Sequence, residues 1–423
     1  MFNRVSGTKD ILPGQVGQWQ DIEAASRKIF STHNYQEIRP PLIEEAALFN
    51  RSLGEGTEIV QKQMFVIKRE EDLYALRPEG TASVVRAYIE NNLDKTNGFV
   101  KFYYMGPMFR AERPQKGRLR QFHHIGVEAI GSVEPEIDIE VISLADSLLK
   151  AYFVEGYEIL VNSLGCVNDK KNLALFLRDK LKDKINRFCP DCQSRFEKNV
   201  FRILDCKNDS CQDIVNEINL GTAHLCPDCS GHFEKVKAGL DLLGVNYRVS
   251  PKLVRGLDYY TRTVFEFKHS RLGPQQDALG AGGRYDGLVK ELGGPEMGAV
   301  GFAFGVERLL LVSSCKFQVS GEKLVYLISL GDTAKFESLK LLRDLRAAGI
   351  SAETDYENKS LKASMRKAND LGARFVLILG DDELKENAVM LKDMSAQKQE
   401  KVALPEIISR LKVYINEPTK ITN

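Results

Sequence analysis

A run of basic residues, FRAERPQKGRLRQFHHIGVE, occupies positions 109–128. Its cationic side chains fall within eleven positions: Arg110, Arg113, Lys116, Arg118 and Arg120. A guanidinium group binds phosphate oxygens through paired N–H groups and keeps its charge. A solvated turn is the ordinary explanation for such a run. Because the aromatic residues Phe109 and Phe122 and the acidic Glu112 are interleaved with the cations, the run favours a binding site for a polyanion such as a nucleoside triphosphate.

Two β-strands should hold this loop. Residues 101–109 are rich in aromatic side chains, and residues 121–128 continue on the other side of the basic run. Pro114 and Gly117 interrupt the pattern between them. The sequence therefore predicts two strands joined by a long basic loop.

A second polar group follows a predicted hairpin of residues 62–67 and 72–76. The segment LRPEGT at 76–81 precedes a predicted helix at 82–91. Glu79 and Thr81 thus stand at a strand-to-helix junction, where backbone N–H groups are free to bind a ligand. A carboxylate at this position also caps helices, and both interpretations remain open.

No dinucleotide or P-loop fingerprint accompanies these residues, because the sequence has neither strand–GxGxxG–helix nor GxxxxGK[ST]. Phosphates would instead be held by arginines on a sheet, namely Arg110, Arg255 and Arg308. Residues 253–267 predict two β-segments around a polar turn, and the glycines of 280–283 should let backbone approach a small ligand. A strand at 34–43 ends in Pro40-Pro41, which predicts an edge strand or one that meets a partner chain.

Composition places the chain among ordinary globular proteins. It has 423 residues, 43% hydrophobic and 28% charged, with a net charge of +1. This length predicts two or three domains. The near-zero charge excludes a global attraction to nucleic acid or anionic membranes. With no apolar run of about 18 residues and no apolar leader segment, we expect a cytoplasmic protein without membrane contact.

Cysteines gather in a lysine-rich, helical stretch at 166–246 that has the character of an insertion. Six of the eight cysteines lie between Cys189 and Cys229. Cys189-x-x-Cys192 and Cys226-x-x-Cys229 have the paired spacing of a tetrahedral zinc site, so these four are the candidate ligands of a structural zinc. Because Cys206 and Cys211 lie between them, the ligand set stays open, and reduced thiols are the alternative.

Beyond a linker at 315–322, strand and helix patterns alternate. Strands are predicted at 324–330, 351–355, 375–379 and 388–394, and helices at 334–348, 360–371 and 406–414. We therefore predict a first domain at 1–320 and a compact α/β domain at 324–423.

Five motifs resemble those of class II aminoacyl-tRNA synthetases, and specifically the histidyl-tRNA synthetase family. Pro41, FRAE at 109–112 and GFAFGVERL at 301–309 are similar to the three class II signatures. LVRGLDYYTRTVFEF at 253–267 and GAGGRYDGL at 280–288 are similar to the histidine-specific blocks, and LRPEGT fits the same family. The resemblance covers essentially the whole chain. It implies an α+β fold, with an antiparallel β-sheet catalytic domain, flanking helices, the helical insertion and a C-terminal α/β anticodon-binding domain.

The activity implied by the resemblance is activation of L-histidine with ATP and Mg²⁺ to histidyl-adenylate. Transfer to the 3′ end of tRNA(His) would follow, releasing AMP and diphosphate, in a homodimeric enzyme. The chemistry of the residues agrees, because adenylate formation needs placed cations and no covalent nucleophile. The sequence has no Ser/His/Asp or Cys/His signature.

The resemblance also assigns roles to residues. The expected ATP-binding residues are Arg110 at the α-phosphate, Glu112 and Phe122 at the adenine, and Arg118 and Arg308 at the γ-phosphate. The expected histidine-binding residues are Glu79, Gly80 and Thr81 at the amino group, Arg110 at the carboxylate, Glu128, Tyr259 and Tyr260 around the imidazole, and His124. Arg255 and Arg110 would be catalytic. For Arg255, the alternative is a structural arginine paired with Asp258, which is close to it in the sequence. His124 stands where the family more often has glutamine, so a packed histidine is the alternative there.

A rival interpretation is a non-catalytic paralogue that binds histidine as a regulatory subunit of histidine biosynthesis. Such proteins typically lose the ATP-facing arginines and the anticodon-binding module. This chain keeps Arg110, Arg255, Arg308 and the C-terminal domain, which favours the enzyme.

Overall fold

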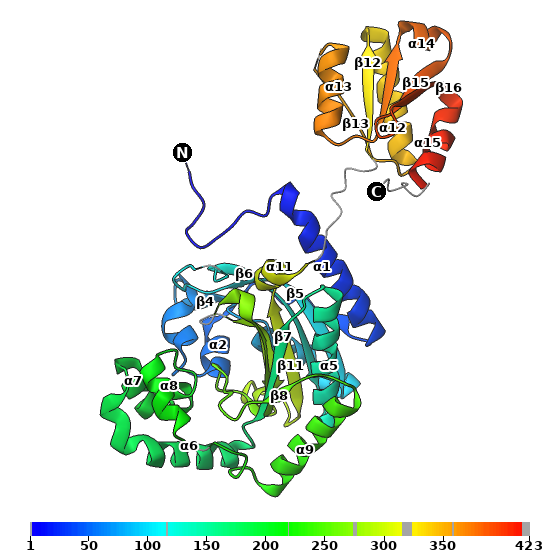
Figure 1. Cartoon of the computed structure of the whole chain (residues 1–423). Helices are drawn as coiled ribbons and strands as arrows, with labels where there is room; N and C mark the ends of the chain where they lie inside the picture. The colour runs from blue at the N-terminus through cyan, green and yellow to red at the C-terminus, as the bar shows by residue number, and fades with distance from the viewer. Residues whose placement is uncertain are drawn as a thin grey trace. The chain divides into compact units, whose positions relative to one another are not determined.

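The computed structural model describes residues 2–115, 117–218, 220–273, 277–314, 324–357 and 359–416. Lys116 of the basic run and the predicted linker at 315–322 lie outside these residues. The chain forms two compact units, Met1–Lys316 and Phe317–Asn423 (Figure 1).

A large sheet organises the first unit. Within the described residues it has eight strands. Their order is β1 (Gln36–Glu37), β5 (Val100–Phe109), β6 (Gln121–Ile130), β11 (Ala299–Gly305), β10 (Ala278–Arg284), β9 (Thr261–His269), β7 (Tyr157–Ser163) and β8 (Arg248–Val249). All neighbouring pairs are antiparallel except the outermost two, β1 with β5 and β7 with β8. The predicted antiparallel sheet and the edge strand before Pro40 are confirmed.

Helices cover one face of this sheet. Buried side chains of α1 (Pro13–Thr32), α5 (Pro135–Ala151) and α9 (Pro227–Leu242) share a core with those of the central strands. Strand side chains alternate between faces, so Ile125 and Val127 of β6 join this core while His124 and Glu128 point to the other side. The opposite face therefore carries the polar side chains of the predicted site.

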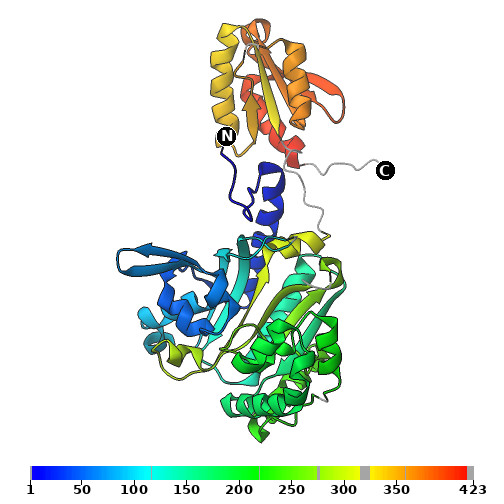
Figure 2. The same cartoon turned by 90° about the vertical axis from the view of Figure 1, so that its left-hand side faces the viewer.

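That opposite face also receives α2 (Ala46–Leu53), α3 (Thr81–Glu90) and most of the predicted helical insertion, namely α6 (Val167–Leu181), α7 (Pro190–Lys198) and α8 (Asp209–Asn216). The last helix of the insertion, α9, packs on the other face with α1 and α5. A second sheet pairs β2 (Ile43–Glu45) with β4 (Asp72–Leu76) and β3 (Phe65–Arg69), which confirms the predicted hairpin. Figure 2 shows this hairpin projecting from the unit.

One element prediction is wrong. Residues 253–267 contain a strand only from Thr261 onward. In the first part, the Leu253 carbonyl accepts a hydrogen bond from the Asn162 amide, and the Asp258 carbonyl accepts one from Lys170 Nζ, both at 3.0 Å. Because side chains satisfy this backbone, no strand neighbour is needed.

The second unit is the predicted α/β domain. In its described part, a five-stranded sheet has the order β13 (Ala352–Thr354), β12 (Val325–Leu330), β14 (Phe375–Gly380), β15 (Ala388–Asp393) and β16 (Lys398–Ala403). Its helices are α12 (Asp332–Ala347), α13 (Leu361–Asp370), α14 (Asp381–Lys385) and α15 (Ile407–Asn416). The sequence prediction missed α14, which has only five residues and buries none of them, and β16, which is a polar edge strand with little apolar alternation.

Across the described residues, no helix combines the length and the apolar character required to cross a lipid bilayer.

Candidate active site

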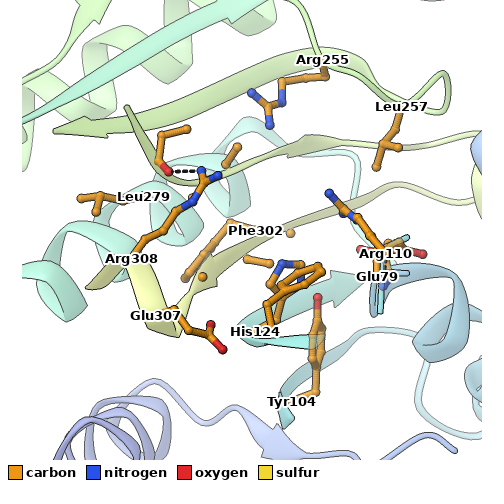
Figure 3. Close-up of a pocket in the computed structure, with 18 of the residues that line it drawn as sticks. Glu79, Tyr104, Arg110, His124, Arg255, Leu257, Leu279, Phe302, Glu307 and Arg308 are labelled. Carbon is orange, nitrogen blue, oxygen red and sulfur yellow. Dashed lines mark hydrogen bonds between the residues drawn. The ribbon is translucent and has the colours of Figure 1, made fainter. Parts of the chain in front are cut away.

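A cavity of about 260 Å³ lies against the polar face of the large sheet. It collects all the predicted substrate residues except Gly80: Glu79, Thr81, Arg110, Glu112, Arg118, Phe122, His124, Glu128, Arg255, Tyr259, Tyr260 and Arg308. Figure 3 shows side chains from several separate segments of the chain around this one space. Segments far apart in the sequence are thus brought together as the motifs predict.

Backbone carbonyls, more than carboxylates, hold the arginines at one end of the cavity. Arg110 Nε donates to the Pro78 carbonyl at 3.0 Å, and its guanidinium lies 5.2 Å from the centre of the Phe122 ring. Arg308 donates to the carbonyls of Gly117 and Ala278, at 3.1 and 2.6 Å. Because carbonyls carry no net charge, this end of the cavity stays positive and suits phosphate groups.

Glu112 is the carboxylate nearest these cations. Its Oε2 lies 3.1 Å from Arg118 Nε, and its Oε1 lies 3.9 Å from Arg110 Nη1. One carboxylate between two arginines orients them without cancelling their combined charge. Glu112 thus holds Arg110 and Arg118 next to each other on the cavity wall.

Arg255 enters from the segment before β9. Its Nη1 lies 2.8 Å from Glu266 Oε1, and its Nε has no hydrogen-bond partner among the described residues. The sequence suggested Asp258 as a structural partner for Arg255, and that pairing is wrong. The Asp258 carboxylate instead accepts from the Asn199 amide at 2.8 Å. Arg255 is thus held by a strand carboxylate while part of its guanidinium remains available to a ligand.

A buried carboxylate marks the other end of the cavity. Glu128 is 1% exposed. Its oxygens accept hydrogen bonds from the Thr81 hydroxyl at 2.7 Å and from the Tyr285 hydroxyl at 2.5 Å. Burial raises the pKa of Glu128 to about 8, against the opposing effect of these hydrogen bonds. This carboxyl group is therefore protonated in much of the free protein near neutral pH.

Glu79 has the capping role that was left open. Its carboxylate accepts from the backbone N–H groups of Thr81 and Ala82, at 2.6 and 2.9 Å, at the start of α3. The same side chain lines the cavity. Burial raises the pKa of Glu79, with the backbone hydrogen bonds acting in the other direction. Capping and a position in the site are thus combined in one residue.

His124 is half-buried on the cavity wall. Its ring meets that of Phe122 edge-on, with centroids 5.1 Å apart, and no described residue bonds to its Nδ1. Burial, and next the positive charge of Arg110, lower the pKa of His124 well below its usual value. The imidazole stays neutral, so it can donate and accept hydrogen bonds as the more usual glutamine would.

Sequence reasoning missed other lining residues, among them Tyr104, Tyr285 and Glu307. Tyr104 is buried on β5, and the alternation of that strand could have placed it on the cavity face with Phe102. Glu307 is tied to His123, whose Nδ1 lies 2.9 Å away. Tyr285 shows no sequence signal apart from its position in the GAGGRYDGL block.

The glycines at 280–283 have a different main role from the one predicted. A Cβ at Gly280 would lie 2.4 Å from the Phe304 ring, and one at Gly282 would lie 2.6 Å from the Phe265 ring. Both rings belong to the core on the helical face of the sheet. These glycines make room for core packing, although Gly280 also lines the cavity.

Gly80 and Gly126 make room for Tyr104. A Cβ at Gly80 would lie 2.4 Å from the tyrosine ring, and one at Gly126 would lie 2.5 Å from it. We expect Gly126→Ala to destabilise the protein by about 1–3 kcal/mol, because the packed ring has to move. The melting temperature of Gly126→Ala should be several degrees below that of the wild type. The control is Gly17→Ala in α1, where a Cβ meets no atom within 4 Å. Equal melting temperatures for both variants would contradict this account.

The four cysteines predicted as one zinc set do not share a site. Cys189 and Cys192 gather with Cys206 and Cys211, whereas Cys226 and Cys229 gather with Cys166 and Asp169. The predicted grouping of the two Cys-x-x-Cys pairs is therefore wrong. Sequence spacing identified the pairs, but the partners of each pair depend on how the insertion folds.

Comparison with known proteins agrees with the fold and identifies the family. Residues 7–309 match the family described as "Histidyl-tRNA synthetase", and residues 324–414 match "Anticodon binding domain". The chain is 44% identical to "Histidine--tRNA ligase" of Desulforamulus reducens, across 97% of this chain and 99% of the relative. It is also 44% identical to the protein of the same name from Bacillus subtilis, across 97% and 98%.

Solved structures give the same result. The chain is similar to the apo histidyl-tRNA synthetase of S. aureus, with 35% identity, a TM-score of 0.80 and coverage of 97% and 100%. A structure titled "ATP phosphoribosyltransferase regulatory subunit/histidyl-tRNA synthetase", from Bacillus halodurans, has 22% identity, a TM-score of 0.66 and coverage of 90% and 98%. That second likeness shows a shared fold alone. With the family match over most of the first unit and relatives of this identity over nearly the whole length, the chain belongs to the histidyl-tRNA synthetase family.

Proposed function

We propose that this chain activates L-histidine with ATP and then transfers the histidyl group to the 3′ end of tRNA(His). The observation that carries the proposal is the convergence of Arg110, Arg255 and Arg308 on one cavity whose other end holds the buried Glu128. Membership of the histidyl-tRNA synthetase family supports the same activity, and the curated relatives bear the ligase name.

In the first step, a carboxylate oxygen of histidine attacks the α-phosphorus of ATP. A new O–P bond forms, the bond from the α-phosphorus to the bridging oxygen breaks, and diphosphate leaves with the electron pair. Negative charge grows on the α-phosphoryl group during this step. We assign Arg110 and Arg255 to that charge, and Arg118 and Arg308 to the γ-phosphate. In the second step, the terminal hydroxyl of the tRNA attacks the acyl carbon, and AMP leaves.

Mg²⁺ would be bound with the ATP phosphates and would neutralise part of their charge. Glu112 is the acidic group beside the phosphate arginines, which makes it the candidate protein ligand. We place the adenine ring against Phe122. Its other neighbours would be the backbone and side chains around Glu112.

Recognition of histidine is assigned to the opposite end of the cavity. The imidazole would lie between Glu128, Tyr259 and Tyr260, while Glu79, Gly80, Thr81 and His124 would surround the amino group and the ring edge. The tyrosine rings of 259 and 260 are 4.6 Å apart and buried, so they form an apolar wall. A ring with two nitrogens is told from other rings by hydrogen-bonding groups fixed in such a wall.

The regulatory-subunit interpretation is not favoured. A histidine-binding subunit without activity has no use for arginines at an ATP end, and this chain has Arg110, Arg118 and Arg308 lining the cavity. The full-length relatives at 44% identity bear the ligase name, whereas the structure with the regulatory title is only 22% identical.

Charging of tRNA tests the complete reaction. Labelled histidine should become attached to tRNA(His) in an ATP-dependent manner, and a tRNA for another amino acid should remain uncharged.

The C-terminal unit, which matches an anticodon-binding domain, is proposed to contact the anticodon. Because charged tRNA is consumed at ribosomes, the proposal places the chain in the cytoplasm. Folded protein that charges no tRNA would contradict the proposed aminoacylation activity.

We also propose a homodimer. Apolar side chains are exposed along the small sheet and the segment before it: Leu42, Ile43, Val66, Ile67 and Leu73. Val66 is 51% exposed and belongs to β3, one strand of the hairpin. An exposed apolar ribbon beside the Pro40-Pro41 segment fits a two-fold contact between copies.

Light scattering across a dilution series should therefore give the mass of two chains. Val66→Asp should weaken the dimer. Phe336→Asp, at a comparably apolar and more exposed position of the second unit, should leave it intact. A fully active monomer at working concentrations would contradict the proposal.

A further inference from the structure

Seven of the eight cysteines lie between positions 166 and 229, a concentration that the proposed catalysis does not use. Within the part of the chain that the structure describes, they form two separate clusters. One contains Cys189, Cys192, Cys206 and Cys211, and the other contains Cys166, Cys226, Cys229 and Asp169. In each cluster the ligand atoms all lie within 4.8 Å of one another. We propose that each cluster binds one structural zinc ion.

Both clusters are built in the same way. The sequence Cys-Pro-Asp-Cys occurs at 189–192 and again at 226–229. In each copy the first cysteine is the N-cap of a helix, α7 or α9, and proline occupies the first turn. Since side chains three positions apart lie on one side of a helical turn, each copy presents two sulfur atoms together. Two tetrahedral ligands are thus supplied from one short segment.

The remaining ligands come from earlier or later turns of the insertion. Cys206 and Cys211 stand on either side of the N-cap Asn208 of α8. Cys166 is the N-cap of α6, and Asp169 is the third residue of that helix. Cys166-x-x-Asp169 therefore has the spacing of a Cys-x-x-Cys pair, with a carboxylate in place of the second thiolate. Zinc accepts both ligand types.

Backbone N–H groups are directed at the sulfur atoms. The N–H of Cys189 donates to Cys211 Sγ at 3.3 Å, and that of Cys166 donates to Cys229 Sγ at 3.2 Å. The N–H of Asn208 donates to Cys206 Sγ at 3.5 Å. Such donors stabilise negative charge on sulfur, which a thiolate ligand carries and a thiol does not.

Asp169 supplies the second cluster with a buried carboxylate ligand. It is 2% exposed, and it accepts from the backbone N–H groups of Cys166 and Cys226 at 3.2 and 3.0 Å. Among the described residues no lysine, arginine or histidine forms an ion pair with it. A zinc ion at the centre of the cluster would give this buried carboxylate a cationic partner.

The clusters also have a structural purpose in the proposed enzyme. The second one joins the start of α6 to the start of α9, the two ends of the cysteine-bearing segment. In α6, one residue beyond Asp169, Lys170 Nζ donates to the carbonyl of Tyr260 at 2.8 Å. From the end of α7, the Asn199 amide holds Asp258. Zinc would thus fix the helices that support the tyrosine wall of the cavity.

Metal analysis of the whole protein, purified without chelator and with reductant present, tests the proposal. We expect two equivalents of zinc per chain. Cys192→Ser and Cys229→Ser should each retain one equivalent, and the double variant none. Cys315→Ser is the control, because Cys315 lies outside the insertion in the sequence, and it should retain two. Asp169→Asn should lower the content to one, whereas Asp169→Cys should keep two.

Cobalt substitution provides a readout that does not depend on variants. The native chain refilled with Co²⁺ should bind two equivalents with the absorption of tetrahedral thiolate sites. Fewer than about 0.1 equivalents of zinc in folded protein, with no cobalt uptake, would overturn the proposal. A zinc content of one equivalent per chain, lost only when the cysteines of one particular cluster are replaced, would overturn the claim of two sites. Disulfides in freshly isolated protein, detected as missing thiols after denaturation, would also overturn it.

Discussion

Arg255→Ala is expected to slow adenylate formation by at least about 10²–10³-fold, the usual effect of removing a preorganised charge-stabilising donor. The histidine carboxylate attacks the α-phosphoryl group as negative charge accumulates there. Arg110 alone would leave one side of that group without paired N–H donors. Arg255 lines the same cavity from a different segment, with its Nε unbonded to any described residue and its Nη1 held by Glu266. Single-turnover formation of the adenylate is the measurement.

The variant should melt near the wild-type temperature and still bind tRNA. When the Arg255 guanidinium is removed, the Glu266 carboxylate still has Lys268 as a partner, because Lys268 Nζ lies 3.5 Å from Glu266 Oε2. Arg255→Lys should recover only part of the rate, because an ammonium group cannot reproduce the planar fork. Lys268→Ala is the matched control, since it removes a cation from the same carboxylate outside the cavity lining. Adenylate formation within tenfold of wild type in Arg255→Ala would make Arg255 a structural residue.

Glu128→Gln is expected to impair histidine use in a pH-dependent way. Burial raises the pKa of this carboxyl group to about 8, above the value of about 4.3 for an exposed glutamate. A histidine N–H facing Glu128 is bound best by the ionised form. The ratio of wild-type to variant kcat/KM for histidine should therefore rise roughly tenfold between pH 7 and 9, as the wild-type group loses its proton. Glutamine cannot ionise, so it supplies no such increase.

At pH 9 the kcat/KM of Glu128→Gln for histidine should be about 10–100-fold below that of the wild type, because a hydrogen bond to a charged group is lost. The KM for ATP should change little, because the arginines at the other end of the cavity are untouched. Because the substrate histidine titrates in the same way with both proteins, its titration cancels when the wild-type kcat/KM is divided by that of the variant. A ratio that stays constant with pH, or falls, would contradict the assigned role of Glu128.

Local patterns predicted much of the fold. The alternation of β5 and β6 and the basic residues between them were enough to place Arg110, Phe122 and Glu128 on one hairpin. The polar junction before α3 placed Glu79 and Thr81 at a helix start. Such features depend on neighbours in the sequence, where side-chain period and turn chemistry determine the outcome.

The errors concern contacts between distant segments. Asp258 was the nearest acidic residue to Arg255 in sequence, but β9 brings Glu266 to it instead. Cysteine spacing identified two pairs, yet only the folded insertion shows that Cys166 and Asp169 complete one of the clusters. Tyr104 was overlooked because its ring packs against two glycines that are distant in the sequence. Gly80 belongs to the junction before α3, and Gly126 lies opposite Tyr104 on the neighbouring strand β6.

Exchange of labelled diphosphate into ATP tests the central claim most directly, because it reports formation of the aminoacyl-adenylate without tRNA. The proposed function predicts exchange that requires L-histidine and Mg²⁺, that no other amino acid supports, and that is lost in Arg255→Ala. Folded, histidine-binding protein that supports no exchange with any amino acid would contradict the account and would favour the regulatory-subunit interpretation.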